Sequence, residues 1–162
     1  MQNNPPTFMN GNSEYLTFNL AGEEYGIDIL KVKEILAYQA VTKIANTAPF
    51  IIGIINLRGN IVPIVDLRIK FNLREVNYDG CTVVIVLNIL EREIGIVVDC
   101  VLDVISLPAE HIHAAPKLGP NEDVQYFAGV GTLDGRMIIL TDIERLLSAS
   151  EMALFAFPGE LT

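Results

Sequence analysis

The chain has 162 residues, of which 51% are hydrophobic, and it carries a formal net charge of −9. This length and composition supply a core for one compact unit or for two closely joined small ones. The negative charge opposes binding to a nucleic-acid backbone, which requires clustered Lys and Arg. Apolar runs of about five residues are far shorter than the ~18 that cross a membrane. We therefore expect a soluble, cytoplasmic protein with no nucleic-acid partner.

The N-terminal segment is expected to be a disordered tail that is followed by strands. Residues 1–13 are rich in Asn, Pro, Gly and Ser and have no periodicity. From Glu14 onward, alternating apolar and polar residues predict strands, and short Gly-containing or charged segments predict turns. The predicted hairpins pair Tyr15–Leu20 with Tyr25–Ile27, Gly53–Leu57 with Ile61–Val65, Thr82–Leu90 with Ile94–Val98, and Val130–Leu133 with Met137–Leu140.

Two features interrupt the strands in the first half of the chain. Asp28 is expected to cap a short helical turn that continues to Val32. The strand pattern then resumes at Ile35 and Leu36. Pro63 cannot donate a hydrogen bond to a neighbouring strand, which predicts a sheet edge or a bulge at this position.

The second half contains a long loop and the clearest helix signals. Residues 108–125 include three prolines and two histidines and are predicted to form a loop. Thr141 or Asp142 is expected to cap a helix that continues to Leu147. A capping-box pattern that starts at Ser148 predicts a final helical piece. Many short strands with few helices favour a mainly β fold of two small closed sheets over alternating βαβ units.

The sequence contains two copies of one pattern. The aligned segments are Glu23–Leu36 with Glu91–Leu107, and Ile51–Leu67 with Phe127–Ile143. Gly26 aligns with Gly95 at an offset of 69 residues, and the long loop of the second copy raises the offset to 76 for the second pair of segments. Each copy would be only marginally stable alone. We therefore expect the copies to pack together and to leave a groove between them.

The residue types that support catalysis or cofactor binding form no convincing group. His111 and His113 could face one way on a strand, but no further metal ligand is evident, and two exposed loop imidazoles are favoured. The glycines around Gly131 lack the spacing and the following helix of a dinucleotide site. Asp66 and Asp142 lie where strands end and lack the Asp-Thr-Gly context of an aspartic dyad. Capping is the favoured role for both carboxylates.

Arg58 marks a position at which the two copies differ. It occupies a predicted hairpin tip where the second copy has Asp134, so the copies carry opposite charges at one structural position. Position alone is as consistent with a solvated turn arginine as with an anchor at an interface. In the second case, the planar guanidinium would grip a carboxylate of a partner in two places.

The two cysteines are expected to be free. Cys81 and Cys100 are too few for a disulfide framework. Both lie in apolar, strand-like surroundings, where a free cysteine behaves as a small hydrophobic residue. A structural disulfide is therefore disfavoured.

Four segments together resemble a known family. They are EEYGIDILKVKEIL (23–36), INLRGNIVPIVDLR (55–68), TVVIVLN (82–88) and GIVVDCVLDVISL (95–107). In this order they resemble the bacterial chemotaxis coupling proteins of the CheW family, from Glu14 to about Phe157. The resemblance implies two intertwined five-stranded SH3-like barrels around a shared core, with short helices and a C-terminal helix. The expected division is a disordered tail over 1–13, a CheW-like domain over 14–157 and a flexible C-terminus over 158–162.

The resemblance also implies a function. The family comprises adaptors without catalytic activity or cofactor, which couple the cytoplasmic tips of methyl-accepting chemoreceptors to the regulatory domain of the histidine kinase CheA and support kinase activation in membrane-associated receptor arrays. The positions that match the family's receptor site are Gly53, Asn56, Leu57, Arg58, Val83, Val101 and Val104. Those that match its kinase site are Val32, Glu34 and Ile35. We name these the expected receptor set and the expected kinase set.

The residues themselves support this assignment to different degrees. A groove lined by Val and Ile with Arg58 at its lip would accept a receptor helix that presents an apolar stripe and charged flanks. Val101 and Val104 could equally belong to an ordinary core, and the same holds for the apolar members of the kinase set. Glu34 is the better sign that its strand faces a partner. Cys100, which is expected near the groove, departs from the family pattern, which often has a small residue such as Gly there.

Two functions from other classes stay open. A small ligand-binding or hydrolytic protein would use the groove and the acidic residues at strand ends, and would need a convergent cluster of titratable groups. A structural β module would self-associate through its exposed strand edges. Sedimentation at rising concentration would reveal the second of these.

Overall fold

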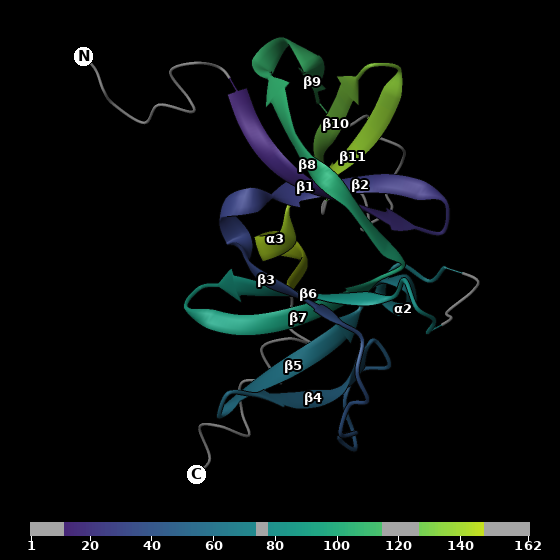
Figure 1. Cartoon of the computed structure of the whole chain (residues 1–162), viewed down its shortest axis with the longest axis vertical. Coiled ribbons are helices and arrows are strands. Elements are labelled where there is room, and N and C mark those ends of the chain that lie inside the picture. Colours follow the sequence, from purple (N-terminus) through teal and green to yellow (C-terminus); the bar gives the residue numbers. More distant parts are fainter. Residues whose placement is uncertain (1–11, 74–77, 115–126, 148–162) are drawn as a thin grey trace.

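The computed structural model describes residues 12–73, 78–114 and 127–147 (Figure 1). The first half of the chain forms β1 (Asn12–Leu20), β2 (Glu23–Asp28), the 3-10 turn η1 (Ile29–Lys31), β3 (Val32–Ala37), β4 (Ile51–Leu57), β5 (Asn60–Asp66) and α2 (Leu67–Lys70). The second half forms β6 (Val83–Ile89), β7 (Arg92–Val98), β8 (Cys100–Pro108), η2 (Ala109–His111), β9 (Ile112–His113), β10 (Phe127–Leu133), β11 (Arg136–Thr141) and α3 (Ile143–Leu147). The mainly β class expected from the sequence is confirmed.

The strands form two sheets, and each sheet contains strands from both copies. The first sheet has the order β8-β1-β2-β11-β10-β9, and the second has the order β3-β6-β7-β5-β4. The β1–β2 hairpin of the first copy thus joins strands of the second copy, and the β6–β7 hairpin of the second copy joins strands of the first. Figure 1 shows the first sheet at the top, the second at the bottom and α3 between them. Because neither copy holds a complete sheet, the two copies are intertwined.

The duplication extends to the register of the parallel strands. β2 runs parallel to β11 with Gly26 opposite Leu140, and β7 runs parallel to β5 with Gly95 opposite Ile64. A Cβ added at Gly95 would lie 2.7 Å from Ile64 Cδ1, and one added at Gly26 would lie 3.1 Å from Ile138 Cγ2. The aligned glycines therefore leave room for branched side chains on the neighbouring strand.

The apolar core is divided into three clusters, of which one joins the two sheets. The largest lies between the sheets and takes side chains from both sheets and from α3, including Phe18, Leu20, Ile85, Ile96 and Leu146. A second cluster belongs to the second sheet and comprises Ile55, Leu57, Val62, Ile64, Val84, Val86 and Val97. The third belongs to the first sheet and comprises Ile105, Leu107, Ile138 and Leu140. Each sheet therefore has an apolar cluster of its own on one face and packs against the other sheet through the shared cluster. This arrangement is consistent with two small units around a shared core.

All four predicted hairpins form, and most of their strands extend beyond the predicted limits, whereas β6 is one residue shorter at each end than the predicted Thr82–Leu90. β1 begins at Asn12, inside the expected tail, because residues 12–14 pair with residues 106–108 of β8. This pairing joins segments that are far apart in the sequence, so the local pattern gives no sign of it. The rest of the expected tail and the helical piece expected after Ser148 lie outside the described residues.

The helix caps expected from the sequence are confirmed. Asp28 Oδ1 accepts a hydrogen bond from the backbone N–H of Leu30 at 2.9 Å. At α3, Asp142 rather than Thr141 acts as the cap, since its Oδ1 accepts from the N–H of Arg145 at 3.1 Å. Each carboxylate satisfies a backbone donor that the first turn leaves unpaired.

Two local predictions are wrong in part. β5 lies between β7 and β4, so Pro63 is not on an edge strand, and the bulge of this hairpin falls between Ile51 and Gly53 instead. Pro63 is tolerated because the ladder with β7 begins only at Ile64. The expected loop over 108–125 also contains structure within its described part, since η2 is followed by β9, which pairs with β10.

Candidate functional site

The β4–β5 hairpin holds Arg58 at its tip. Arg58 and Gly59 form a two-residue turn with φ of 52° and 90°, and Asn56 Oδ1 accepts a hydrogen bond from Gly59 N at 2.9 Å. Positive φ at both positions matches the twist of the flanking strands. The Arg58 side chain is 62% exposed. Local turn chemistry therefore presents the guanidinium at the surface.

The side chain of Arg58 reaches back to β3 and forms an ion pair with Glu34. Both guanidinium Nη atoms donate to the carboxylate, and Nη1 lies 3.5 Å from Oε1. The hydrogen bond to Glu34 and the negative charge of that carboxylate raise the pKa of Arg58. A member of the expected receptor set is thus in direct contact with a member of the expected kinase set.

The expected kinase set lies on β3, at one edge of the second sheet. The register of β3 against β6 shifts between Val32 and Glu34, which marks a bulge. Val32 is half-buried and packs against the shared core, whereas Ile35 is 43% exposed. Glu34 and Ile35 are therefore accessible to a partner, and Val32 supports the strand from behind.

Two members of the expected receptor set are buried and position the hairpin. Leu57 is 8% exposed and belongs to the apolar cluster of the second sheet. Gly53 has φ of +154°, and a Cβ added there would lie 2.5 Å from the carbonyl oxygen of Thr42. Thr42 needs this close approach because it exchanges two backbone hydrogen bonds of 2.9 Å with Ile54. Only glycine fits at this crossing of two chain segments.

The three valines of the expected receptor set lie elsewhere in the fold. Val83 on β6 and Val101 on β8 are half-buried and pack against the shared core. Val104 is 53% exposed on β8, an edge strand of the first sheet. Through the duplication, Val101 and Val104 occupy the positions that Val32 and Ile35 have in the first copy. The expected receptor set is thus divided among the β4–β5 hairpin, Val83 on the inner strand β6 of the second sheet, and the edge strand β8 of the first sheet.

The second copy builds its counterpart of the ion pair differently. Asp103 lies at the position equivalent to Glu34, but the tip residue equivalent to Arg58 is Asp134, with φ of 50°. Asp103 instead contacts Arg136, whose Nη2 lies 3.3 Å from its Oδ1. The exposed tip of the second copy is therefore acidic. The sequence indicated a difference between the two tips, and in the structure it is a difference of surface charge.

A buried ionic network beside the second sheet was missed by the sequence reasoning. Arg68 is 1% exposed, and its Nε and Nη2 each donate to Asp66 at 3.0 Å while Nη1 donates to Asp99 at 2.8 Å. Asp99 also accepts from the backbone N–H of Ala21 at 2.8 Å, and Tyr78 donates to Asp66 at 2.7 Å. This network ties the crossing from β7 to β8 to the β1–β2 turn, so it joins the two sheets.

The role assigned to Asp66 was therefore correct but incomplete. Its Oδ1 accepts from Arg68 N at 3.0 Å and caps α2, as expected. Burial lowers the pKa of the Arg68 guanidinium, but hydrogen bonds to Asp66 and Asp99 outweigh this effect and leave the pKa raised. The signal that could have revealed the network is an arginine two residues after an aspartate that ends a buried strand.

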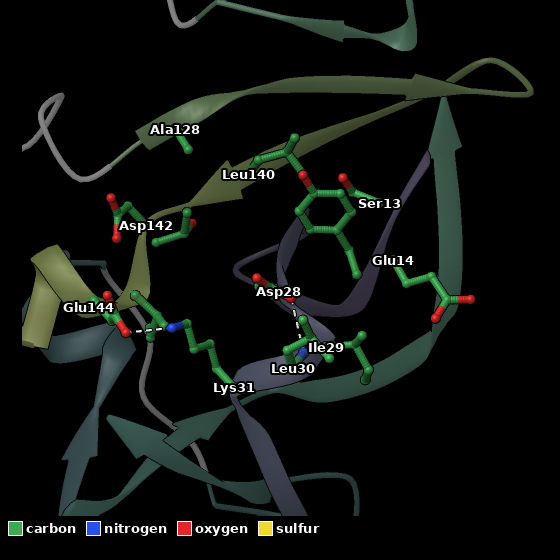
Figure 2. Close-up of a pocket in the computed structure, with 13 residues that line it drawn as sticks. Ser13, Glu14, Asp28, Ile29, Leu30, Lys31, Ala128, Leu140, Asp142 and Glu144 are labelled. Carbon is green, nitrogen blue, oxygen red and sulfur yellow. Dashed lines mark hydrogen bonds and ion pairs between the residues drawn. The ribbon is translucent and has the colours of Figure 1, made fainter. Parts of the chain in front are cut away.

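A hollow of about 570 Å³ lies among β1, η1, β11 and α3 (Figure 2), and none of its lining residues belongs to either expected set. Three of its four acidic lining residues have structural partners: Asp28 caps η1, Asp142 caps α3, and Glu144 forms an ion pair with Lys31, while the fourth is Glu14. The hydrogen bond to Glu144 raises the pKa of Lys31. This arrangement gives no support to the alternative of a hydrolytic or ligand-binding site that uses acids at strand ends.

The two histidines and the possible metal ligands form no site in the described part of the chain. His111 is half-buried in η2 and His113 is exposed, so the expectation of two exposed imidazoles is correct for His113 alone. Within residues 12–73, 78–114 and 127–147, no group of three or more His, Cys, Asp or Glu side chains is arranged to hold a metal ion. No helix in this part of the chain has the length and apolar composition of a membrane span.

The fold is a β scaffold of two intertwined sheets. Its candidate sites are exposed surfaces for binding other proteins, at an edge strand and at a hairpin tip. Residues 14–151 match the family model of the CheW-like domain, so the chain belongs to the CheW-like family of chemotaxis scaffold proteins.

Relatives and a solved structure agree with this assignment. The chain is 59% identical over 141 residues to the chemotaxis protein CheW of Klebsiella aerogenes, covering 87% of this chain and 85% of that protein. It is 33% identical over 147 residues to the chemotaxis protein CheW of Treponema pallidum, covering 88% and 86%. The crystal structure of the scaffolding protein TtCheW from Thermoanaerobacter tengcongensis matches with a TM-score of 0.79 and 32% identity, over 86% of this chain and 94% of that one.

Proposed function

We propose that the protein is a non-catalytic adaptor that couples the cytoplasmic tips of methyl-accepting chemoreceptors to the regulatory domain of the histidine kinase CheA. The observation that carries this proposal is the ion pair between Arg58 and Glu34. It joins a residue of the expected receptor set to a residue of the expected kinase set, so an event at one surface has a direct physical route to the other.

The receptor contact is centred on Arg58. The Arg58 side chain is 62% exposed at the tip of a two-residue turn, so a carboxylate on a receptor helix can approach its guanidinium from solvent. Such a carboxylate competes with Glu34 for the same donors. Binding of the receptor would then release Glu34 from its partner, which changes the charge presented along β3.

The kinase contact is centred on the edge strand β3. Ile35 supplies exposed apolar surface, and Glu34 supplies a charge beside it. A small apolar anchor with a charged neighbour on a sheet edge is suited to docking a second folded domain. Because β3 and the β4–β5 tip are neighbours, both partners would be held on the second sheet at the same time.

In this proposal the protein acts in the cytoplasm and is recruited to membrane-associated receptor arrays by its partners. No chemistry is required of it, because its contribution is to hold two other proteins in a productive arrangement and so to support kinase activation. Association through interfaces of moderate strength is sufficient for this role when many copies assemble in one array.

The experiment that tests the proposal is co-sedimentation of the purified protein with receptor cytoplasmic fragments, with the CheA regulatory domain, and with both together. We expect binding in each binary mixture and a three-component complex in the third. Failure to bind either partner, or displacement of one partner by the other, would contradict the proposal. Sedimentation of the protein alone at rising concentration is the control, and concentration-dependent assembly would favour the self-associating module instead.

A further inference from the structure

The two cysteines are brought together where the chain crosses from the second sheet to the first. Val83 pairs with Val98 at the end of the β6–β7 ladder, and this register continued by two residues places Cys81 opposite Cys100. Burial first, and then the nearby side chain of Cys81, raise the pKa of the Cys100 thiol, whose Sγ donates to the carbonyl oxygen of Val101 at 3.6 Å. The expectation that both lie in strand-like, apolar surroundings is wrong for Cys81, which is exposed in a turn.

The surrounding structure fixes both partners in this arrangement. The turn that carries Cys81 is closed by a hydrogen bond of 2.9 Å from Cys81 N to Asp79 Oδ1 and by one of 3.1 Å from Thr82 N to Asp79 O. On the other side, Cys100 pairs with Asn19 of β1. Cys81 lies in the turn before β6, two residues beyond the last pair of the ladder. Residues directly opposite one another on antiparallel strands have Cα atoms about 4.5–5.5 Å apart, so this register continued to Cys81 and Cys100 would give a Cα separation of that size. This spacing lies within the range of about 4.4–6.8 Å that disulfides require.

We propose that Cys81 and Cys100 form a reversible intramolecular disulfide when the protein meets a peroxide. The proposal concerns the chemistry of this chain alone and does not depend on the proposed function. A disulfide of this kind in a reducing compartment is transient and acts as a sensor rather than as a structural brace.

The accessible thiol reacts first. Cys81 is exposed, whereas Cys100 is half-buried, and burial together with the neighbouring Cys81 raises the pKa of the Cys100 thiol. The thiolate sulfur of Cys81 attacks one oxygen of the peroxide and the O–O bond breaks. Hydroxide is the leaving group, and Cys81 becomes a sulfenic acid. The sulfur of Cys100 then attacks the sulfur of Cys81, and the S–O bond breaks as the S–S bond forms. Together the two thiols lose two electrons and two protons, and hydrogen peroxide becomes two waters.

The bond would tighten the junction between the sheets. Cys100 follows Asp99, which accepts hydrogen bonds from Arg68 and from the β1–β2 turn. Tying this crossing to the turn before β6 closes a loop of about twenty residues, which stabilises the folded state by restricting the unfolded chain. We expect the melting temperature of the oxidised protein to rise by roughly 5–10 °C over the reduced protein.

The test uses the full-length protein, reduced and then treated with a slight excess of hydrogen peroxide. We expect both free thiols to be lost, the intact mass to fall by two hydrogens, the protein to stay monomeric and a dithiol reductant to reverse the change. Digestion with trypsin should yield a peptide of residues 75–92 linked to one of residues 93–117, since Arg74, Arg92 and Lys117 are the cleavage sites.

Single variants separate this reaction from unrelated oxidation. With Cys100→Ser, the reaction should stop at a sulfenic acid on Cys81 that dimedone traps, and with Cys81→Ser the thiol of Cys100 should survive the same exposure. Disulfide-linked dimers of the wild-type protein, or a wild-type protein that accumulates sulfinic acid on Cys81 while Cys100 stays free, would overturn the proposal. A melting temperature that does not rise on oxidation would overturn its structural consequence.

Discussion

The guanidinium of Arg58, at the tip of the β4–β5 hairpin, forms an ion pair with the carboxylate of Glu34 on the edge strand β3. The equivalent positions in the second copy are Asp134 and Asp103, so two acids stand where the first copy has an attractive pair. Arg58 and Asp134 have nearly the same φ, 52° and 50°. The hairpin tip therefore accepts either charge without a change in its backbone. A substitution of Arg58 can change the surface charge without disturbing the fold.

Replacing Arg58 with Asp should abolish receptor binding and leave the fold intact. Asp134 demonstrates that an aspartate is accommodated at this turn, and the substituted carboxylate would repel both Glu34 and an acidic receptor group. We expect affinity for a receptor cytoplasmic fragment to fall by roughly 30-fold or more, the scale of an interface hot spot. Isothermal titration calorimetry measures the affinity, and circular dichroism checks the fold. The matched control is Asp134→Arg, which makes a charge change of equal size and opposite sign at the equivalent tip and should bind normally. Unchanged affinity in Arg58→Asp would remove Arg58 from the receptor site.

Reversing the ion pair tests whether the contact itself links the two surfaces. Glu34→Arg alone places two guanidinium groups side by side and should weaken kinase binding. Adding Arg58→Asp restores an attractive pair with the charges exchanged. If kinase binding depends on the ion pair itself and not on the sign of the charge at position 34, the double variant should regain kinase affinity relative to Glu34→Arg. A double variant as weak as the product of the two single effects would indicate that each residue contacts its own partner independently.

Ile35→Asp should weaken binding of the CheA regulatory domain and spare receptor binding. The Ile35 side chain is 43% exposed on β3, so a charge there disturbs the surface while the apolar clusters stay intact. We expect a loss of roughly 10-fold or more in kinase affinity, measured by calorimetry with each partner separately. Met137→Asp is the control, because Met137 is 68% exposed on the other sheet. Equal loss of both partners in Ile35→Asp would point to misfolding and contradict the assignment of β3 to the kinase.

The sequence predicted the hairpins, the caps and the duplication because these depend on neighbouring residues. Arg58 and its turn could be recognised locally, since a charged residue before glycine between two apolar runs fixes the tip. The intertwined sheets could not be worked out from the pattern alone, because β-strand alternation specifies which residues are buried but not which strand lies alongside. Pro63 was misplaced for this reason. Arg68 was missed because a sequence does not distinguish a buried arginine from an exposed one. Its partner Asp99 is 31 residues away along the chain and lies beside it only in the folded structure.

Arg68→Ala should destabilise the protein strongly. Arg68 is 1% exposed and neutralises Asp66, which is fully buried, so removing the guanidinium leaves an uncompensated carboxylate in the interior. Removal of one partner of a buried ion pair costs about 3–5 kcal/mol. Urea denaturation should report this loss as a lower midpoint. Arg92→Ala, at an exposed position of β7, is the control and should change stability by less than about 0.5 kcal/mol. A midpoint for Arg68→Ala that matches the wild type would show that the network does not hold the sheets together.

Gly53→Ala tests whether a member of the expected receptor set acts through the fold rather than by contact. A Cβ at this position would lie 2.5 Å from the carbonyl oxygen of Thr42, and the backbone has φ of +154°. The clash is with a backbone atom that cannot rotate away, so we expect a loss of about 3 kcal/mol or more in the free energy of unfolding. Gly59→Ala is the matched control: Gly59 also has positive φ, 90°, but a Cβ there meets no atom within 4 Å. It should cost only about 1 kcal/mol from backbone strain. If Gly53→Ala were as stable as Gly59→Ala and still failed to bind receptor, Gly53 would have to contact the receptor directly, and the crossing of Thr42 over β4 would not be what positions the hairpin that carries Arg58.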